Sequence, residues 1–236
     1  MSRAPDQSPA RSSASIVREY GPFPGVDHVH GVTYDGRQVW IAGGDRLNAI
    51  DPDSGATLQS IDVAAHAGTA FDGRYLYQIA EARIQKIDPK SGRVLATIPA
   101  PGGGADSGLA WAEGTLWVGQ YRERKIHQVD PQTGAILRTI ESNRFVTGVT
   151  WVDGELWHGT WEGEQSEIRR IDPATGQVLD SLEMPPGVIV SGLESDGGDQ
   201  FFCGGGNSGK LRAVRRPGRK RATARASGIP GESTGS

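Results

Sequence analysis

The feature that most constrains the fold is a motif that occurs five times along the 236-residue chain. Each copy places a glycine after a short run of varied residues, and continues through an Asp-Gly or equivalent turn to a pair of apolar or aromatic residues. The turn glycines lie 37, 41, 40 and 43 residues apart, at Gly36, Gly73, Gly114, Gly154 and Gly197. Because this spacing is that of propeller blades, the repeats predict a five-bladed β-propeller.

A second motif, Asp-Pro-x-Ser/Thr-Gly, lies between the copies and starts at Asp51, Asp88, Asp130 and Asp172. Proline restricts φ at the turn, and glycine accepts the positive φ with which the chain returns. The flanking segments, such as residues 46–50, alternate in polarity with the period of a β-strand. No segment has the periodicity of an amphipathic helix. We therefore expect an all-β fold of four-stranded blades, with strands A to D in chain order.

The fifth copy lacks its Asp-Pro turn, which predicts how the ring closes. Residues 14–20 resemble the fourth strand of another copy, residues 176–182, and precede the first blade. We expect this N-terminal strand to complete the last blade, because ring closure leaves no unpaired edge. The propeller would then span residues 14–217. Residues 1–13 and 218–236, rich in Ser, Ala, Gly, Pro and Arg, are expected to be disordered.

Composition and net charge restrict the kinds of partner that we expect this protein to bind. A net charge of −3 argues against a general affinity for nucleic acid, and we favour a solvated tail for the four basic residues between 219 and 225. The single cysteine, Cys203, excludes an internal disulfide and favours a reducing compartment. The N-terminus shows no apolar leader, and no apolar run reaches membrane-spanning length. We expect a cytoplasmic, monomeric protein with a small-molecule ligand and no nucleic acid or membrane partner.

Propeller topology predicts where a site can form. The Asp-Gly and Asp-Pro turns share one end of the ring, the bottom, so the B–C loops and the starts of the A strands meet at the top. Three of the five histidines, His28, His30 and His66, fall at starts of A strands, with Asp106 next along. Such a group would suit zinc, iron, manganese or copper, or a general acid–base pair. A purely structural role, bonding neighbouring blades or water, is the third alternative.

Weaker candidates surround this group. Glu194 occupies an A-strand position that is small in the other copies, so it is either a base or metal ligand or a solvated channel wall. Tyr121 and Trp161 fall in B–C loops, where they would contact a ligand unless they are ordinary surface aromatics. His158 stands on strand B, either in a substrate pocket or as a hydrogen-bonded histidine between blades. Three tryptophans in register on the B strands are expected to be core: Trp40, Trp117 and Trp157.

The later blades, in stretches such as residues 152–157 and 168–176, resemble the plant-type glutaminyl cyclotransferase family. The resemblance implies a five-bladed propeller and cyclisation of an N-terminal glutamine. It places that family's catalytic glutamate at Ala67, and its Phe-Thr-Gln-Gly segment at residues 28–31, His-Val-His-Gly in this chain. The repeats are also loosely similar to virginiamycin B lyase, a seven-bladed, metal-dependent propeller, which implies elimination chemistry with histidine and glutamate.

These observations lead to one hypothesis and one alternative. The hypothesis is an enzyme that acts on a small polar molecule at the top of the channel, as a lyase, a hydrolase or a glutaminyl cyclotransferase-like enzyme. Its predicted catalytic residues are His30, His66, Asp106 and Glu194. Its predicted substrate-binding residues are Tyr121, His158 and Trp161, and the metal version uses His28, His30 and His66. The alternative is a non-catalytic propeller that binds a ligand or a protein.

Overall fold

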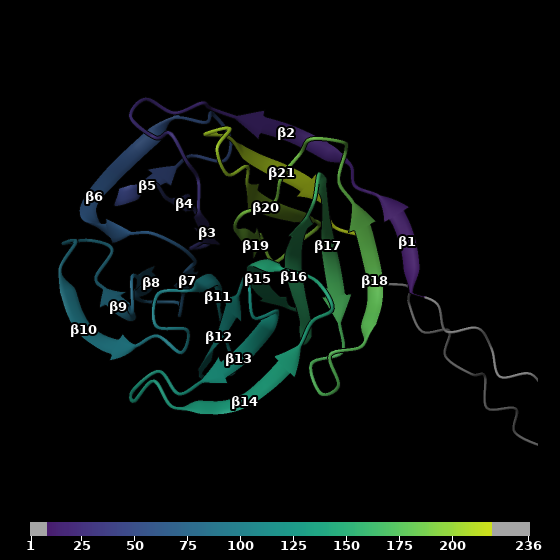
Figure 1. Cartoon of the computed structure of the whole chain (residues 1–236). Coiled ribbons are helices and arrows are strands. Elements are labelled where there is room, and N and C mark those ends of the chain that lie inside the picture. Colours follow the sequence, from purple (N-terminus) through teal and green to yellow (C-terminus); the bar gives the residue numbers. More distant parts are fainter. Residues whose placement is uncertain (1–8, 219–236) are drawn as a thin grey trace, which may run out of the picture.

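Five β-sheets surround a common axis in the computed structural model, which describes residues 9–218 (Figure 1). Blade 1 contains β3 (Gly31–Tyr34), β4 (Val39–Ala42), β5 (Gly44–Ile50) and β6 (Thr57–Ala65). Blade 2 contains β7 (Thr69–Phe71), β8 (Leu76–Ala80), β9 (Arg83–Ile87) and β10 (Val94–Pro99). Blade 3 contains β11 (Asp106–Ala112), β12 (Thr115–Gln120), β13 (Lys125–Val129) and β14 (Ile136–Glu141).

Blade 4 contains β15 (Val146–Val152), β16 (Glu155–Glu162), β17 (Gln165–Ile171) and β18 (Val178–Glu183). Blade 5 contains β19 (Leu193–Ser195), β20 (Gln200–Gly204), β21 (Leu211–Arg215) and the N-terminal β2 (Ile16–Tyr20). Antiparallel pairing of β2 with β21 completes the last blade. The predicted all-β, five-bladed fold and its closure by the N-terminal strand are confirmed. Within the described residues there is no helix, and hence none able to cross a membrane.

The chain is ordered further toward the N-terminus than the predicted boundary at residue 14. Strand β1 (Ala10–Ser13) pairs in parallel with β18, from Ala10 opposite Asp180 to Ser13 opposite Glu183. The expectation of disorder is therefore wrong for residues 10–13. All four residues of β1 are exposed, so the segment carries no apolar alternation, and its pairing follows from the open edge that β18 offers. Residues 1–8 and 219–236 lie outside the described part of the chain.

Five glycines on the inner strands allow the blades to approach backbone to backbone at the axis. A Cβ added at Gly108, Gly148 or Gly192 would lie 2.7, 2.6 or 2.8 Å from a backbone nitrogen of the next blade. At Gly31 and Gly68 the approach is closer still, to Ala67 O and Leu109 N. No side chain fits at such distances. The recurrent glycine of the repeat therefore sets the narrow spacing of the A strands.

Aromatic side chains fill the spaces between blades. Trp40, Trp117 and Trp157 are 0, 1 and 2% exposed, which confirms that they are core residues. Trp117 stacks on Trp151 of the next blade with ring centroids 5.7 Å apart, and Trp157 contacts Phe201 at 5.0 Å. Because each such pair joins two sheets, apolar burial and aromatic contact hold the ring together.

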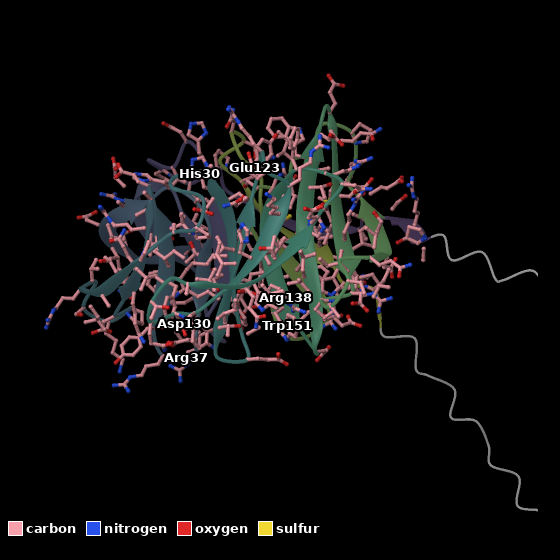
Figure 2. All side chains as sticks on the ribbon, turned by 60° about the horizontal axis from the view of Figure 1, so that its bottom comes forward. His30, Arg37, Glu123, Asp130, Arg138 and Trp151 are labelled. Atoms are coloured by element: carbon pink, nitrogen blue, oxygen red, sulfur yellow. The ribbon has the colours of Figure 1, made fainter. Side chains whose placement is uncertain are left out.

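The two kinds of turn lie at one end of the ring, as predicted. Figure 2 shows Arg37, in the β3–β4 turn, and Asp130, in an Asp-Pro turn, at the end opposite to His30 and Glu123. In each Asp-Pro turn the aspartate accepts hydrogen bonds from backbone amides two and three residues ahead, as Asp130 does from Gln132 and Thr133 at 2.9 and 2.8 Å. These turns are structural, and the top is left for the irregular loops.

Candidate functional site

A pocket of about 310 Å³ opens at the top of the axis and is built from all five blades. Each blade contributes the residue directly before its axial glycine, namely His30, Ala67, Ser107, Thr147 and Ser191. His66 and Asp106 contribute from one position earlier, and Tyr121 and Trp161 from the ends of their B strands. The structure therefore brings together five of the predicted site residues, which come from four different blades.

Tyr121 and Trp161 form the aromatic side of the pocket, and Phe145 stacks on Tyr121 without lining the pocket; we call these three residues the aromatic wall. The Tyr121 ring lies 4.7 Å from that of Phe145 and 6.2 Å from that of Trp161, measured between centroids. Arg124 covers the Phe145 ring at 4.6 Å and pairs with Glu162 at 2.7 Å. Tyr121 and Trp161 are partly exposed and line the pocket, so a ligand there would meet their rings, whereas the Phe145 ring is covered by Tyr121 and Arg124.

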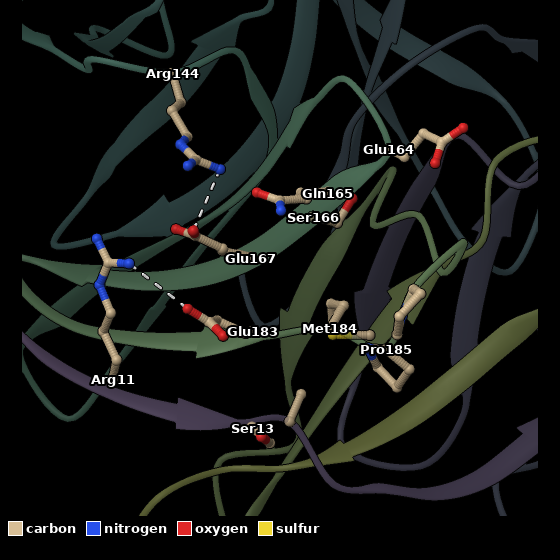
Figure 3. Close-up of a pocket in the computed structure, with 12 residues that line it drawn as sticks. Arg11, Ser13, Arg144, Glu164, Gln165, Ser166, Glu167, Glu183, Met184 and Pro185 are labelled. Carbon is tan, nitrogen blue, oxygen red and sulfur yellow. Dashed lines mark ion pairs between the residues drawn. The ribbon is translucent and has the colours of Figure 1, made fainter.

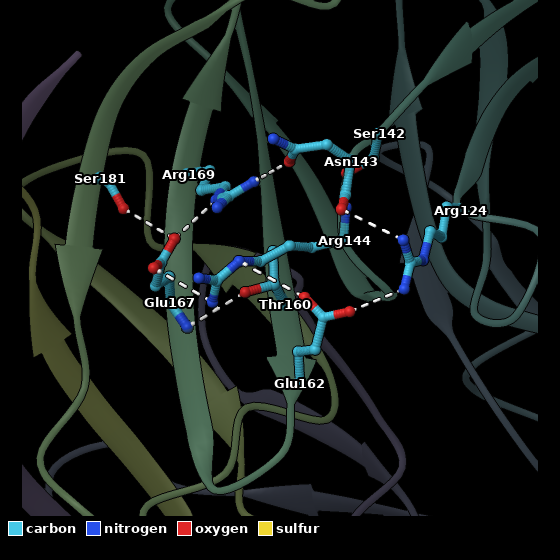
Figure 4. Close-up of polar contacts among 9 residues, drawn as sticks. All are labelled: Arg124, Ser142, Asn143, Arg144, Thr160, Glu162, Glu167, Arg169 and Ser181. Atoms are coloured by element: carbon cyan, nitrogen blue, oxygen red, sulfur yellow. Dashed lines mark hydrogen bonds and ion pairs between the residues drawn. The ribbon is translucent and has the colours of Figure 1, made fainter. Parts of the chain in front are cut away.

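Figure 4 shows a network of ion pairs and hydrogen bonds that connects Arg124 and the β14–β15 segment to blade 4. Arg144 lies 3.7 Å from Glu162 and 3.2 Å from Glu167, and Arg169 donates to Glu167 at 2.6 Å. Arg169 also donates to Asn143 at 2.6 Å. Each charge in this network has an opposite partner, so the network fixes the loop that carries Phe145 without needing a ligand.

Asp106 is a buried carboxylate at the start of β11, only 7% exposed. The N–H of Gly102 donates to both carboxylate oxygens, at 3.0 and 2.9 Å. Burial raises the pKa of Asp106, and the bonds from Gly102 and the Gln120 side chain oppose the rise. The corresponding position in blades 1, 4 and 5 is a fully buried valine. The fold thus accepts an apolar residue here, so the carboxylate is not a requirement of the propeller.

His30 is the partly buried imidazole of the pocket. His28 stacks on it with centroids 5.4 Å apart and an interplanar angle of 28°. Burial lowers the pKa of His30, and the positive charges that His28 and His66 can carry lower it further. His30 is therefore mostly neutral at neutral pH and can accept a proton.

The three predicted metal ligands are neighbours without forming a coordination group. His28 and His66 are exposed, and a positive charge on either of them lowers the pKa of His30. Across residues 9–218, no three His, Cys, Asp or Glu side chains are arranged to hold a metal ion. The hypothesis of a zinc, iron, manganese or copper site gains no support from this geometry.

Glu194 lies on β19, two residues after the axial glycine Gly192, and is not among the residues that line the pocket. Its carboxylate accepts hydrogen bonds from Thr33 of blade 1 at 2.8 Å and Thr150 of blade 4 at 2.5 Å. The Ser195 N–H donates a third at 2.9 Å. Burial raises its pKa to about 7 despite these bonds. Some solvent contact remains along the axis, although protein surrounds the group. Glu194 joins three blades and does not line the pocket.

His158 lies away from the pocket, between blades 3 and 4. It is 1% exposed, its Nδ1 is 3.2 Å from Gly159 O, and a separate cavity of about 260 Å³ adjoins it. Burial, with a smaller effect from Arg169, lowers its pKa to about 4. The structure thus does not bring this predicted substrate-binding residue to the ligand pocket, because B-strand side chains at this position point between blades.

A larger cavity, of about 690 Å³, lies at the side of the ring beneath β1 (Figure 3). Ion pairs cross it, from Arg11 to Glu183 at 3.7 Å and from Arg144 to Glu167 at 3.2 Å. It contains no histidine. Size alone therefore does not mark the functional site, and the smaller pocket at the axis has the more reactive groups.

Sequence reasoning missed several pocket residues. Ser107, Thr147 and Ser191 line the pocket, and Asn207 reaches it from the β20–β21 loop. Ser107 donates to Val146 O at 2.7 Å, and Ser191 donates to Val29 O, so both hydroxyls also link blades. The signal was present in the alignment of repeats, because the residue before the axial glycine is a hydroxyl residue in three copies.

Comparison with known proteins places this fold but not its activity. Residues 105–213, from blade 3 to blade 5, match a family described as a repeat of unknown function (DUF6923). No curated protein matches the chain.

Among solved structures, glutaminyl cyclase of Myxococcus xanthus is similar at a TM-score of 0.74 and 19% identity, covering 88% of this chain and 98% of the cyclase chain. Hydrazine synthase of Kuenenia stuttgartiensis matches with a TM-score of 0.48 and 18% identity, over 75% of this chain and 55% of that one. The similarity to the cyclase shows a shared five-bladed architecture, and so confirms the predicted resemblance at the level of the fold.

Proposed function

We propose that this protein is an enzyme that acts on a small polar molecule in the pocket at the top of the axis, with His30 as the group that accepts and returns a proton. The observation that carries the proposal is the convergence of a neutral imidazole and a buried carboxyl, from different blades, on one pocket with an aromatic side. Pairs of titratable groups whose pKa values are displaced in this way are typical of acid–base sites.

Acyl transfer at a glutaminyl side chain is the reaction we favour. The structurally similar Myxococcus protein is a glutaminyl cyclase. In such a cyclisation the N-terminal amine attacks the side-chain amide carbon, a new C–N bond forms, and ammonia leaves. The attacking nitrogen loses a proton and the leaving nitrogen gains one. A single group that accepts the first proton and donates the second balances the reaction.

His30 is placed to supply that group. The resemblance to the cyclotransferase family puts its catalytic glutamate directly before the axial glycine of blade 2, where this chain has Ala67. A methyl group transfers no proton. His30 occupies the same register position in the adjacent blade, and both residues line the pocket. We propose that His30 of blade 1 performs the proton transfer that the resemblance assigns to the equivalent position of blade 2.

The test is incubation of the purified protein with a glutaminyl dipeptide, following ammonia release and the pyroglutamyl product by mass spectrometry. We expect turnover, and a loss of at least about 100-fold in kcat/KM for His30→Gln. His127→Gln is the matched control, because His127 is a buried histidine in β13, hydrogen-bonded to Thr139 at 2.8 Å, and outside the pocket. Absence of ammonia release by folded protein would refute the glutaminyl reaction. Equal rates for His30→Gln and His127→Gln would refute the role of His30.

One observation favours a second function, that of a non-catalytic binding propeller. Two partly exposed rings of the aromatic wall, Tyr121 and Trp161, line the pocket, as aromatic residues often do at binding surfaces. In that case a ligand would bind without turnover. Its affinity would fall on Tyr121→Ala or Trp161→Ala and would be unchanged on His30→Gln.

A further inference from the structure

The charge balance of the pocket indicates what kind of ligand it takes. Asp106 is only 7% exposed, and none of the ion pairs within residues 9–218 involves it. Glu167, the other deeply buried carboxylate described above, lies 2.6 Å from Arg169 and 3.2 Å from Arg144. Removing a carboxylate from water is costly unless an opposite charge accompanies it. The hydrogen-bond partners of Asp106, the Gly102 N–H and the Gln120 side chain, are both neutral, so a cationic ligand would supply the opposite charge that the described residues do not.

The repeats show that this carboxylate is a local addition. Val29, Val146 and Val190 occupy its position in three other blades, each 0% exposed. A valine at this point would cost no desolvation and would pack as its equivalents do. The Gly102 N–H, shared between the two oxygens, and the Gln120 side chain hold the carboxylate in place and leave lone pairs for a further donor, since an ionised carboxylate can accept about four hydrogen bonds.

The aromatic wall is a second, independent indication of a cationic ligand. Aromatic faces attract ammonium groups through the negative potential above the ring. Tyr121 and Trp161 occupy equivalent positions, one residue beyond the matched B-strand residues Gln120 and Thr160. The other blades have non-aromatic residues there, Gly44, Glu81 and Gly206. The rings are thus confined to blade 3, which carries Asp106, and to the adjacent blade 4.

We propose that the pocket binds an alkylammonium group, a protonated amine or a quaternary ammonium, with its charge against Asp106 and its alkyl surface against Tyr121 and Trp161. The proposal deepens the proposed function by naming the substrate class of the same pocket. The protonated N-terminal amine of a glutaminyl peptide is one member of that class, and it would have to release one proton to solvent before the neutral amine could attack the amide carbon. His30 and His66 also face the pocket and oppose a cation when they are protonated, so binding is strongest when both are neutral.

The experiment uses ligands that cannot react. Choline and tetramethylammonium are titrated into the purified protein, with 3,3-dimethylbutan-1-ol as the neutral isostere of choline and inorganic phosphate as an anion. Binding is followed by NMR through the indole N–H of Trp161, assigned by its disappearance in Trp161→Phe. We expect saturable shifts with both ammonium ions and at least about tenfold weaker binding of the neutral alcohol.

Variants test whether the carboxylate of Asp106 supplies the negative charge that binds choline. Asp106→Asn keeps the shape of the side chain and should weaken choline about tenfold, while Asp62→Asn, at an exposed position on β6, should leave binding unchanged. If Asp106→Asn does not fold, Tyr121→Leu with an unchanged melting temperature takes its place, because it keeps the Trp161 reporter, and it should weaken choline more than the neutral alcohol. Equal affinity for choline and the alcohol, or preferential binding of phosphate, would overturn the proposal. Choline binding without glutaminyl turnover would refute the proposed reaction and leave the ammonium site standing.

Discussion

Glu194 makes the stability of the ring depend on pH in an unusual direction. Burial raises its pKa from 4.5 to about 7 in the folded protein. A carboxyl with a raised pKa binds its proton more tightly when folded, so it favours folding below pH 4.5 and loses that contribution as pH rises through about 7. At pH 8 the ionised group should therefore destabilise the propeller relative to an uncharged group of the same shape.

Replacement of Glu194 by glutamine provides that uncharged group. The amide oxygen can accept from Thr150 and from the Ser195 N–H, and the amide nitrogen can donate to Thr33, so the three contacts persist. The difference between pKa 4.5 and about 7 corresponds to roughly 3 kcal/mol at about 1.4 kcal/mol per pKa unit. Because the axis admits some solvent, we expect about 2 kcal/mol, or roughly 4–8 °C in melting temperature for a domain of this size.

The assay is equilibrium unfolding of wild type and Glu194→Gln in denaturant at pH 4.5 and at pH 8. The quantity of interest is the variant minus wild-type free energy of unfolding, which should increase by about 2 kcal/mol between the two pH values. Glu141→Gln, an exposed position on β14, serves as the control and should show no such change. A variant that differs from wild type by the same amount at both pH values would show that burial does not penalise the charge of Glu194.

Three further predictions follow from the same structure. Gly108→Ala should lower the free energy of unfolding by about 1–3 kcal/mol in denaturant titrations, because its Cβ would lie 2.7 Å from Val149 N; an unchanged midpoint would contradict the close approach. His158, with a pKa lowered from 6.5 to about 4, should make the protein lose up to about 3 kcal/mol as pH falls from 6.5 toward 4, and His158→Val should remove that loss in unfolding measured at pH 5 and pH 7.5. If His30 accepts the proton, kcat/KM for a glutaminyl dipeptide should rise with pH through two ionisations, one below pH 6.5 for His30 and one at the substrate's own amine, at about 7.7–8.0; only the lower one should vanish in His30→Gln, and its persistence there would point to another group.

The fold was predictable because the same pattern of strands and turns occurs five times in the sequence. Asp-Gly and Asp-Pro turns fix the strand order, and ring closure then places the start of every A strand at one end. The position of His30 and His66 beside Asp106 follows from that topology without knowledge of side-chain packing. This is why residues from four blades could be assigned to one pocket from the sequence.

What could not be predicted depends on contacts that leave no periodic signal. Strand β1 is wholly exposed and pairs with β18 through its backbone and the exposed ion pair of Arg11 with Glu183. The partners of Glu194 lie 161 and 44 residues away in the chain, at Thr33 and Thr150. The orientation of His158 depends on which face of a B strand points between blades. The pairing of β1, the partners of Glu194 and the orientation of His158 all depend on the register of neighbouring strands, which cannot be derived from a single sequence.

Pairing of β2 with β21 also has a consequence for the order of events during synthesis. His30 lies near the beginning of the described chain and Asn207 near its end, yet both line the pocket, and an isolated bridge joins Val29 to Gly206. Four blades can be translated and packed while this junction is still missing. A ribosome-bound chain that stops before residue 211 should therefore be largely folded and unable to bind ligand, so that binding competence arrives in one late step.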